Sequence, residues 1–217
     1  EILDSVAETD SADILDPARI PQATLLEIPV SRQRNVLRHL IGKVGLPLPD
    51  SAQMDTLIKG LEVQRTDAET QVKWPGGEGR IYRGTLHVFA PFMRSSGDGY
   101  IGELTEDKPW SGPEGHIALI PTTGKGLPDI WVKKGFNIRF RMGGEYFKPL
   151  RYKYNRPLKK WFQETGVPPW LRDRIPLIYK GDELVAVADL WVSAVAEELQ
   201  ETKPRWQVLW TNHPPLT

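Results

Sequence analysis

The residues of this sequence best suited to chemistry are the lysines and arginines between positions 131 and 160. Ten basic residues lie in this stretch with a single acidic residue, Glu145, so its formal net charge is +9 although the whole chain is neutral. Guanidinium and ammonium groups donate charge-assisted hydrogen bonds to phosphate and carboxylate oxygens. Such a concentration of like charge indicates an anionic partner, because the cations would otherwise only repel one another.

A short helix predicted at 157–165 would present part of this charge on one rigid surface. Pro157 suits a first helical turn, and Gly166 followed by two prolines ends the helix. At helical spacing, the apolar face carries Leu158, Trp161, Phe162 and Thr165. The other side carries Arg156, Lys159, Lys160 and Gln163. A solvated helix face is the simpler interpretation of one lysine pair, but together with the upstream cations this side fits a row of phosphates.

Residues that could catalyse a reaction are scarce in this sequence. The chain has no cysteine, its four histidines are scattered, and no nucleophile elbow, metal-binding box or Walker-type loop is present. Glycines 76, 77 and 79 lie between two predicted strands and are typical of a turn. Among the acids, Glu197-Glu198 fit a solvated loop, Asp173 fits a salt bridge, and Asp189 fits a turn or strand end. We therefore predict no catalytic, cofactor-binding or metal-binding residue.

The distribution of charge divides the chain into two modules. Residues 1–125 contain 13 basic and 18 acidic residues, whereas residues 126–217 contain 15 basic and 10 acidic residues. This asymmetry places the anion-binding surface mostly in the second half. No apolar run approaches the roughly 20 residues of a membrane span and no signal peptide is recognisable, so we expect a cytoplasmic protein. The chain begins at Glu1 without methionine, which suggests a fragment of a longer protein.

The periodicity of apolar residues predicts an α+β protein, in which a helical module with a small antiparallel sheet precedes a mixed α+β domain. We expect a linker helix at 1–20, the helical module at 21–91, a linker with one strand (116–120) at 92–128, and the second domain at 129–217. Predicted helices of the first module span 21–27, 31–44 with Ser31 as N-cap, and 51–61 capped by Asp50 or Ser51. Its predicted strands span 71–74, 80–83 and 86–89. In the second domain, predicted strands span 129–133, 136–142, 177–180, 184–188, 190–192 and 206–210, and helical segments span 157–165 and 169–174. Tryptophans 161, 170 and 191 are predicted core residues.

Several motifs of this chain resemble one known family. In the second half they are RPLKKWFQE at 156–164, GVPPWLRDRIPL at 166–177 and GDELVAVA at 181–188. In the first half they are SRQR at 31–34, LR at 37–38, LPLP at 46–49, RTDA at 65–68 and RIYRG at 80–84. These segments are similar to the substrate-recognition and C-terminal domains of bacterial tRNA(Ile)-lysidine synthetases. The resemblance covers most of the chain and is most specific at 156–188. Asp189 and residues 153–155 depart from the pattern of that family.

The resemblance implies a role in tRNA modification. The full enzyme is a ligase that uses ATP, with Mg²⁺, to adenylate the wobble cytidine of tRNA(Ile) with a CAU anticodon and then attaches lysine. Codon reading thereby changes from AUG to AUA. This chemistry belongs to an N-terminal PP-loop domain, whose Ser-Gly-Gly-x-Asp-Ser loop does not occur in this sequence. The chain would then hold a substrate-recognition domain and a PheT/TilS-like C-terminal domain, without cofactor. Its partners would be tRNA(Ile) and the PP-loop domain. The resemblance leaves open whether the chain forms a homodimer.

The resemblance, together with the positive charge, predicts which residues bind RNA. Near the acceptor stem we expect Arg141, Arg151, Arg156, Lys159, Lys160, Gln163, Arg172 and Arg174. Nearer the anticodon we expect Arg32, Arg34 and Arg38. Because the deep groove of A-form RNA hides its bases, such a surface reads shape, phosphates and 2′-hydroxyls. Two alternatives remain at this point: a generic RNA-binding or protein-interaction module attached to another enzyme, and a free-standing enzyme of unknown class.

Overall fold

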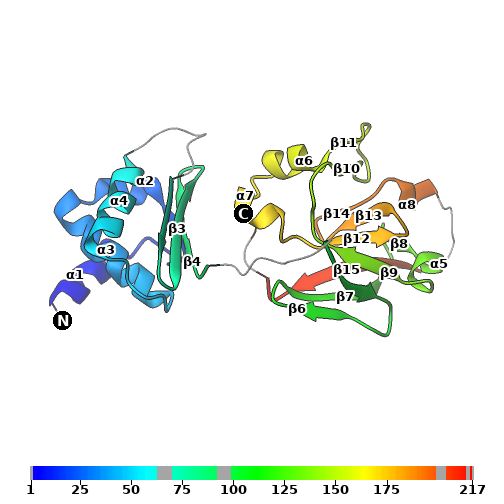
Figure 1. Ribbon diagram of the computed structural model, residues 1–217, viewed down its shortest axis with the longest axis horizontal. Helices are drawn as coiled ribbons and strands as arrows, with labels where there is room; N and C mark the ends of the chain where they lie inside the picture. Colours follow the sequence, from blue (N-terminus) through cyan, green and yellow to red (C-terminus); the bar gives the residue numbers. More distant parts are fainter. Residues whose placement is uncertain (1, 63–69, 92–98, 199–203, 214–215, 217) are drawn as a thin grey trace. The chain divides into compact units, whose positions relative to one another are not determined.

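The computed structural model describes residues 2–62, 70–91, 99–198, 204–213 and 216. The chain divides into two compact units, Glu1–Arg94 and Ser95–Thr217 (Figure 1). Both units combine helices with antiparallel sheets, which confirms the predicted α+β class. Within the described ranges, no helix is both long and apolar enough to cross a membrane.

The helices of the first unit follow from capping and apolar spacing. They are α1 (Ile2–Asp10), α2 (Gln22–Glu27), α3 (Val30–Lys43) and α4 (Ser51–Leu61). Helix α4 begins with a capping box, in which the Asp50 carboxylate accepts from the Gln53 backbone N–H and the Gln53 side chain accepts from the Asp50 N–H. This confirms Asp50 as the cap. The predicted N-cap Ser31 is wrong, because α3 already begins at Val30, after Pro29, and has no side-chain cap.

The sheet of the first unit is antiparallel and small. Its strands are β1 (Arg19–Pro21), β2 (Thr70–Trp74), β3 (Gly77–Tyr82) and β4 (Thr85–Phe89), in the order β1-β4-β3-β2. Arg83 and Gly84 connect β3 to β4 with φ angles of 48° and 75°. Two positive φ angles are typical of a type I′ hairpin turn. The helices gather on one side of the sheet (Figure 1), and the shared core joins α3 residues such as Leu37 to sheet residues such as Leu86.

The second unit contains two larger antiparallel sheets and a short hairpin. The five-stranded sheet has the order β14 (Trp191–Val192), β13 (Glu183–Val187), β12 (Leu177–Lys180), β9 (Phe136–Arg139), β5 (Tyr100–Leu104). The four-stranded sheet has the order β6 (Trp110–Gly112), β7 (Gly115–Thr122), β15 (Arg205–Thr211), β8 (Leu127–Pro128). Strands β10 (Tyr146–Phe147) and β11 (Arg156–Pro157) pair with each other.

Four short helices complete the second unit: α5 (Asp129–Val132), α6 (Leu158–Glu164), α7 (Pro169–Arg172) and α8 (Val195–Glu198). The strand predicted at 129–133 is wrong, because this segment forms α5. A short apolar run does not distinguish a strand from a helix, and here an ion pair of 2.8 Å between Asp129 and Lys133, one helical turn apart, accompanies the helix.

Residues 92–128 also differ from the expected linker with one strand. Their described part contains β5, β6, β7 and β8, which belong to both sheets of the second unit. Its glycines and prolines led to the prediction of an irregular linker. Its strands, however, pair with segments that are distant in the sequence. Leu104 of β5, for example, lies opposite Phe136 of β9. Such non-local pairing leaves little trace in a local pattern.

Candidate nucleic-acid interface

Helix α6 has the two faces that its spacing predicts, except that Thr165 is exposed and follows the last helical residue. Leu158, Trp161 and Phe162 are buried, and the indole N–H of Trp161 donates to the carbonyl of Phe147 at 2.8 Å. This anchor fixes the helix on the β10–β11 hairpin. Lys159 and Lys160 are exposed on the other face. Within the described part of the chain, neither ammonium group forms a salt bridge, so both are available to an anion.

Arg156 lies just before α6, and its guanidinium contacts two side chains of that helix. Its guanidinium forms an ion pair with Glu164 and lies over the Trp161 ring, with Cζ 4.4 Å from the ring centroid. The contact with an aromatic face adds to the ion pair and restrains the planar group. The guanidinium remains partly exposed at the surface. Gln163 is exposed on the same helix.

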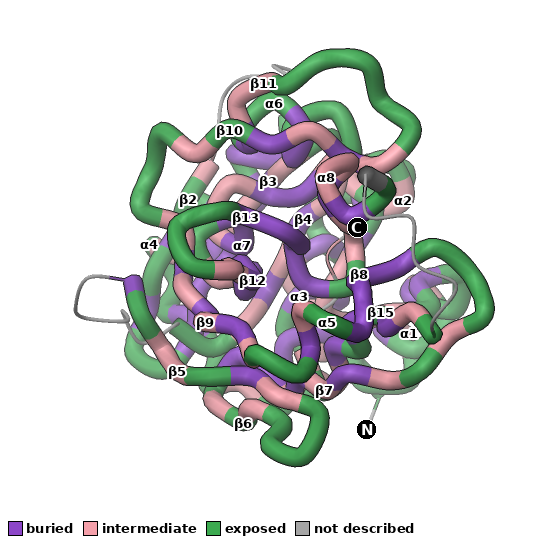
Figure 2. Tube along the Cα trace, turned by 90° about the vertical axis from the view of Figure 1, so that its right-hand side faces the viewer, coloured by how far each residue is buried: buried purple, intermediate pink, exposed green. Residues whose placement is uncertain are grey.

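Residues 148–155 connect β10 to β11, and we call them the basic loop. The base of the loop is anchored: the N–H of Leu150 donates to the carbonyl of Val192 at 2.8 Å, and the N–H of Ala194 donates to the carbonyl of Lys148 at 2.9 Å. Its tip, residues 151–155, is exposed throughout (Figure 2). Residues 148–160 contain six basic residues and no acidic residue, so the loop and α6 form one continuous cationic segment.

Three predicted contact residues lie in less accessible surroundings than we expected. Arg172 is only 6% exposed, and its Nε donates to the carbonyl of Val167 at 2.9 Å. Arg174 forms a 2.6 Å ion pair with the buried Glu114. Arg141 forms ion pairs with Asp173 at 2.7 Å and with Glu145 at 3.2 Å. These guanidinium groups hold the fold of the second unit together, and they differ from the free cations at the loop tip.

The three arginines predicted on the first unit all lie on α3. Arg32 pairs with Asp10 of α1, with Nε donating to Oδ2 at 2.8 Å. Arg34 pairs with Asp55 of α4. Arg38 is exposed and lies one helical turn beyond Arg34. The structure therefore places Arg34 and Arg38 on one side of α3 and uses Arg32 and Arg34 to tie neighbouring helices together.

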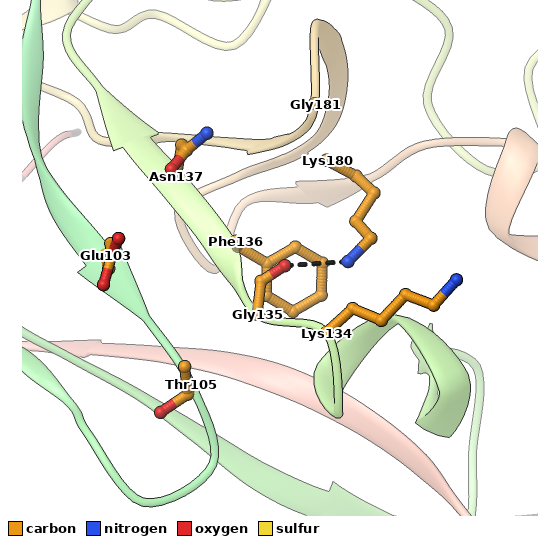
Figure 3. A pocket seen from close by; sticks show the side chains of 8 residues that line it. All are labelled: Glu103, Thr105, Lys134, Gly135, Phe136, Asn137, Lys180 and Gly181. Atoms are coloured by element: carbon orange, nitrogen blue, oxygen red, sulfur yellow. Dashed lines mark hydrogen bonds between the residues drawn. The ribbon is translucent and has the colours of Figure 1, made fainter.

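A separate polar pocket lies between β5, β9 and the β12–β13 turn (Figure 3). Its basic side chains are Lys134 and Lys180, and Glu103 lies on the facing strand. The Lys180 ammonium donates to the carbonyls of Gly135 at 2.9 Å and Trp131 at 3.2 Å. Burial and, secondarily, the nearby Lys134 lower the pKa of Lys180. Because its ammonium is engaged by backbone carbonyls, we interpret Lys180 as a brace for the α5–β9 turn.

Among the described residues, no group of three or more His, Cys, Asp or Glu side chains is arranged to hold a metal ion. Asp189 is exposed in the turn that follows β13, as its interpretation as a turn residue predicts. Trp161 is buried, which confirms its interpretation as a core residue.

Exposed aromatic residues beside the cations were missed by the sequence reasoning. Tyr146, Tyr152 and Tyr154 are 59%, 52% and 65% exposed, respectively. The alternation Arg151-Tyr152-Lys153-Tyr154 was visible in the sequence and could have identified them. Cations interleaved with aromatic rings are typical of surfaces that bind single-stranded nucleic acid.

Comparisons with known proteins match both halves of the chain. Residues 21–87 match the family described as the TilS substrate binding domain, and residues 136–210 match the TilS substrate C-terminal domain. The two matches correspond to the helical unit and to most of the second unit, including the basic loop and α6.

Curated relatives give a consistent picture. A tRNA(Ile)-lysidine synthase of Coxiella burnetii is 32% identical over 187 residues, which are 86% of this chain and 42% of the relative. The protein of the same name from Serratia proteamaculans is 29% identical over 97% of this chain and 48% of the relative. The one from Methylococcus capsulatus is 32% identical over 82% of this chain and 41% of the relative. The chain thus spans less than half the length of these relatives.

Proposed function

Because this chain belongs to the tRNA(Ile)-lysidine synthase family, we propose that it is the tRNA-binding region of such an enzyme and positions the RNA for a reaction carried out elsewhere. The full-length protein would ligate lysine to the wobble cytidine of tRNA(Ile) with a CAU anticodon. ATP and Mg²⁺ would bind in an N-terminal PP-loop domain, so this chain contributes binding and no catalytic group. The observation that carries the proposal is the acid-free cationic segment at 148–160, which lies inside the matched C-terminal domain.

The physical basis of binding is contact with phosphates. Exposed lysines displace counterions from the RNA backbone, which makes affinity depend on salt and little on sequence. Lys159 and Lys160 are the best placed, because the buried face of α6 holds their backbone rigidly while their side chains are exposed. Arg151 extends the same surface into the basic loop, whereas Arg156 already pairs with Glu164 and therefore contributes less. A rigid cationic surface suits recognition of an RNA stem by shape and backbone.

A second contact is proposed on α3 of the first unit. Arg38 is exposed there, and the ion-paired Arg32 and Arg34 lie on the same helix. Arginines that already have a carboxylate partner gain less from a phosphate, so Arg38 carries most of this contact. Two contacts on one RNA raise affinity through effective concentration, and they also orient the molecule for reaction.

The first prediction tests the phosphate contacts of α6. The Lys159→Ala/Lys160→Ala double variant should bind tRNA(Ile) more weakly and with a smaller salt dependence. Each lost phosphate contact should flatten the slope of log K against log salt by about 0.7–0.9. The control is Lys59→Ala/Lys73→Ala, two exposed lysines on α4 and β2 of the first unit, which should leave the slope unchanged. An unaltered slope in the α6 variant would remove these lysines from the interface.

Specificity separates this proposal from a generic RNA-binding or protein-interaction module. Competition of tRNA(Ile) with a CAU anticodon against an unrelated tRNA should favour the isoleucine tRNA. A generic module would show no such preference. Incubation of this chain alone with ATP, lysine and tRNA should give no turnover. Turnover by the isolated chain would favour the alternative that it is a free-standing enzyme.

A further inference from the structure

Phosphate binding does not explain why tyrosine side chains of the second unit are exposed. Tyr152 and Tyr154 lie at the tip of the basic loop and are more than half exposed. Aromatic rings usually gain from burial, and tyrosine is favoured at binding sites because its ring offers a large face and a polar end. Two such rings beside Arg151 and Lys153 indicate a ligand that has both a flat face and negative charge.

The loop holds the Tyr152 ring in a defined position. The Tyr152 ring packs against Trp161 in an edge arrangement, with centroids 4.6 Å apart and planes at 74°. The N–H of Tyr152 donates to the carbonyl of Pro149 at 3.1 Å. Arg151 has a φ angle of 70°, a left-handed conformation that non-glycine residues adopt rarely and mostly where their surroundings impose it. A restrained ring loses less conformational freedom on binding than a mobile one.

An open depression beside Tyr152 provides the space for such a ligand. Its volume is about 450 Å³, and its lining includes Lys148, Arg151, Tyr152 and Lys153. The one acidic side chain in the lining, Glu197, forms an ion pair with Lys125, so its charge is compensated. Three cations around an aromatic ring match the chemistry of a nucleotide, in which a flat base is joined to phosphate.

We propose that Tyr152 and Tyr154 stack against unpaired nucleotides that extend from an RNA stem bound at Lys159 and Lys160. This inference rests on the proposed function, because it takes the RNA stem as the neighbouring ligand. The cations of the basic loop hold the phosphates of the unpaired strand, and the rings hold its bases. Every base has a π face, so the contact tolerates sequence differences. The loop then distinguishes a stem that continues as a single strand from one that ends blunt.

The test compares two RNA probes, a short stem with a blunt end and the same stem with a four-nucleotide single-stranded 3′ extension. With the unaltered chain, we expect the extension to tighten binding by about tenfold or more. The Tyr152→Leu/Tyr154→Leu variant should lose this gain, and Tyr152→Phe/Tyr154→Phe should keep it. On the blunt stem, the salt slope of the leucine variant should stay unchanged, because a tyrosine ring neutralises no phosphate.

Controls distinguish stacking from damage to the fold. Tyr154→Leu alone changes a ring that does not pack against Trp161. This variant should lose part of the affinity gained from the extension, while its unfolding temperature stays the same. Tyr100→Leu alters a tyrosine of β5 that is 48% exposed, and it should leave binding of both probes unchanged. An extension that tightens binding equally in the leucine and unaltered chains would overturn the stacking proposal. The phosphate contacts would still stand if Lys159→Ala/Lys160→Ala flattens the salt slope.

A second experimental outcome would also overturn the stacking proposal. If the leucine variant binds both RNA probes normally but binds the remainder of its own enzyme less tightly, the tyrosines contact protein and not RNA.

Discussion

Several arginines that were expected to bind RNA form ion pairs that hold the fold instead. Arg174 pairs with the buried Glu114, while the cations of the basic loop tip have no carboxylate in the surrounding sequence. Apolar spacing predicted which side of α6 its lysines occupy, because that information is local. It did not predict the burial of Arg172 or the pairing of Arg174. The partner Glu114 is 60 residues away from Arg174, and only the tertiary fold brings the two together.

The Arg174–Glu114 pair gives a prediction at the residue scale. Arg174→Met should destabilise the second unit by about 3 kcal/mol, because it leaves a buried carboxylate without its partner. Urea unfolding measures this loss, and Arg174→Met/Glu114→Gln should recover much of it. Arg38→Met, at an exposed position, serves as the control and should change stability little. If Arg174→Met flattens the salt slope of tRNA binding while the fold stays stable, Arg174 contacts RNA directly.

Short elements position most of the candidate interface. Helix α6 has only seven residues and gains its order from Trp161, Phe162 and the Phe147 carbonyl. Its boundaries were predictable, since Pro157 and Gly166 mark them. The hairpins β3–β4 and β12–β13 were predictable for a similar reason, because their turns and apolar strands are adjacent in sequence. The strand expected at 116–120 is present as β7, but strands β5, β6 and β8 were not predicted, because the sheets that they complete take strands from distant parts of the chain.

The sheet of the first unit contains a histidine whose charge state is set by its neighbours. His87 of β4 lies opposite Arg19 of β1 and Arg80 of β3. Burial and then the Arg19 charge lower the pKa of His87 from 6.5 to about 4, and Asp16 opposes this shift. The folded state therefore keeps His87 neutral at a pH where the unfolded chain binds a proton. Stability contributed by this difference is fully present above about pH 6.5 and is lost as pH falls toward 4.

This gives a prediction about pH. Between pH 7 and 4.5, the unaltered chain should lose about 2 kcal/mol of unfolding free energy through His87, and His87→Gln should remove that part of the loss. Urea unfolding of both proteins at several pH values measures the difference. Other groups also titrate in this range, so the comparison between the two proteins is the informative quantity. Parallel pH profiles would show that His87 does not couple to folding.

At the scale of the whole chain, the charge differs between the two halves, and the proposed contacts with RNA differ accordingly. The first unit has more acidic than basic residues, and two of the three arginines on α3 are ion-paired, whereas the second unit carries the acid-free segment at 148–160. Composition predicted this division, because charge counts need no knowledge of the fold. A chain with one strong and one weak contact would bind most of its RNA through the second unit and use the first for orientation.

The last prediction tests this division with two RNAs. Arg38→Ala should weaken binding of intact tRNA(Ile) by about fivefold, or roughly 1 kcal/mol, but should not affect binding of a minihelix that contains only the acceptor stem. Lys159→Ala/Lys160→Ala should weaken binding of both RNAs, because its contacts lie on the stem that the two share. Fluorescence anisotropy at a fixed salt concentration gives the four affinities. If Arg38→Ala weakens the minihelix as much as the intact tRNA, the two units contact the same part of the RNA, and α3 does not reach toward the anticodon.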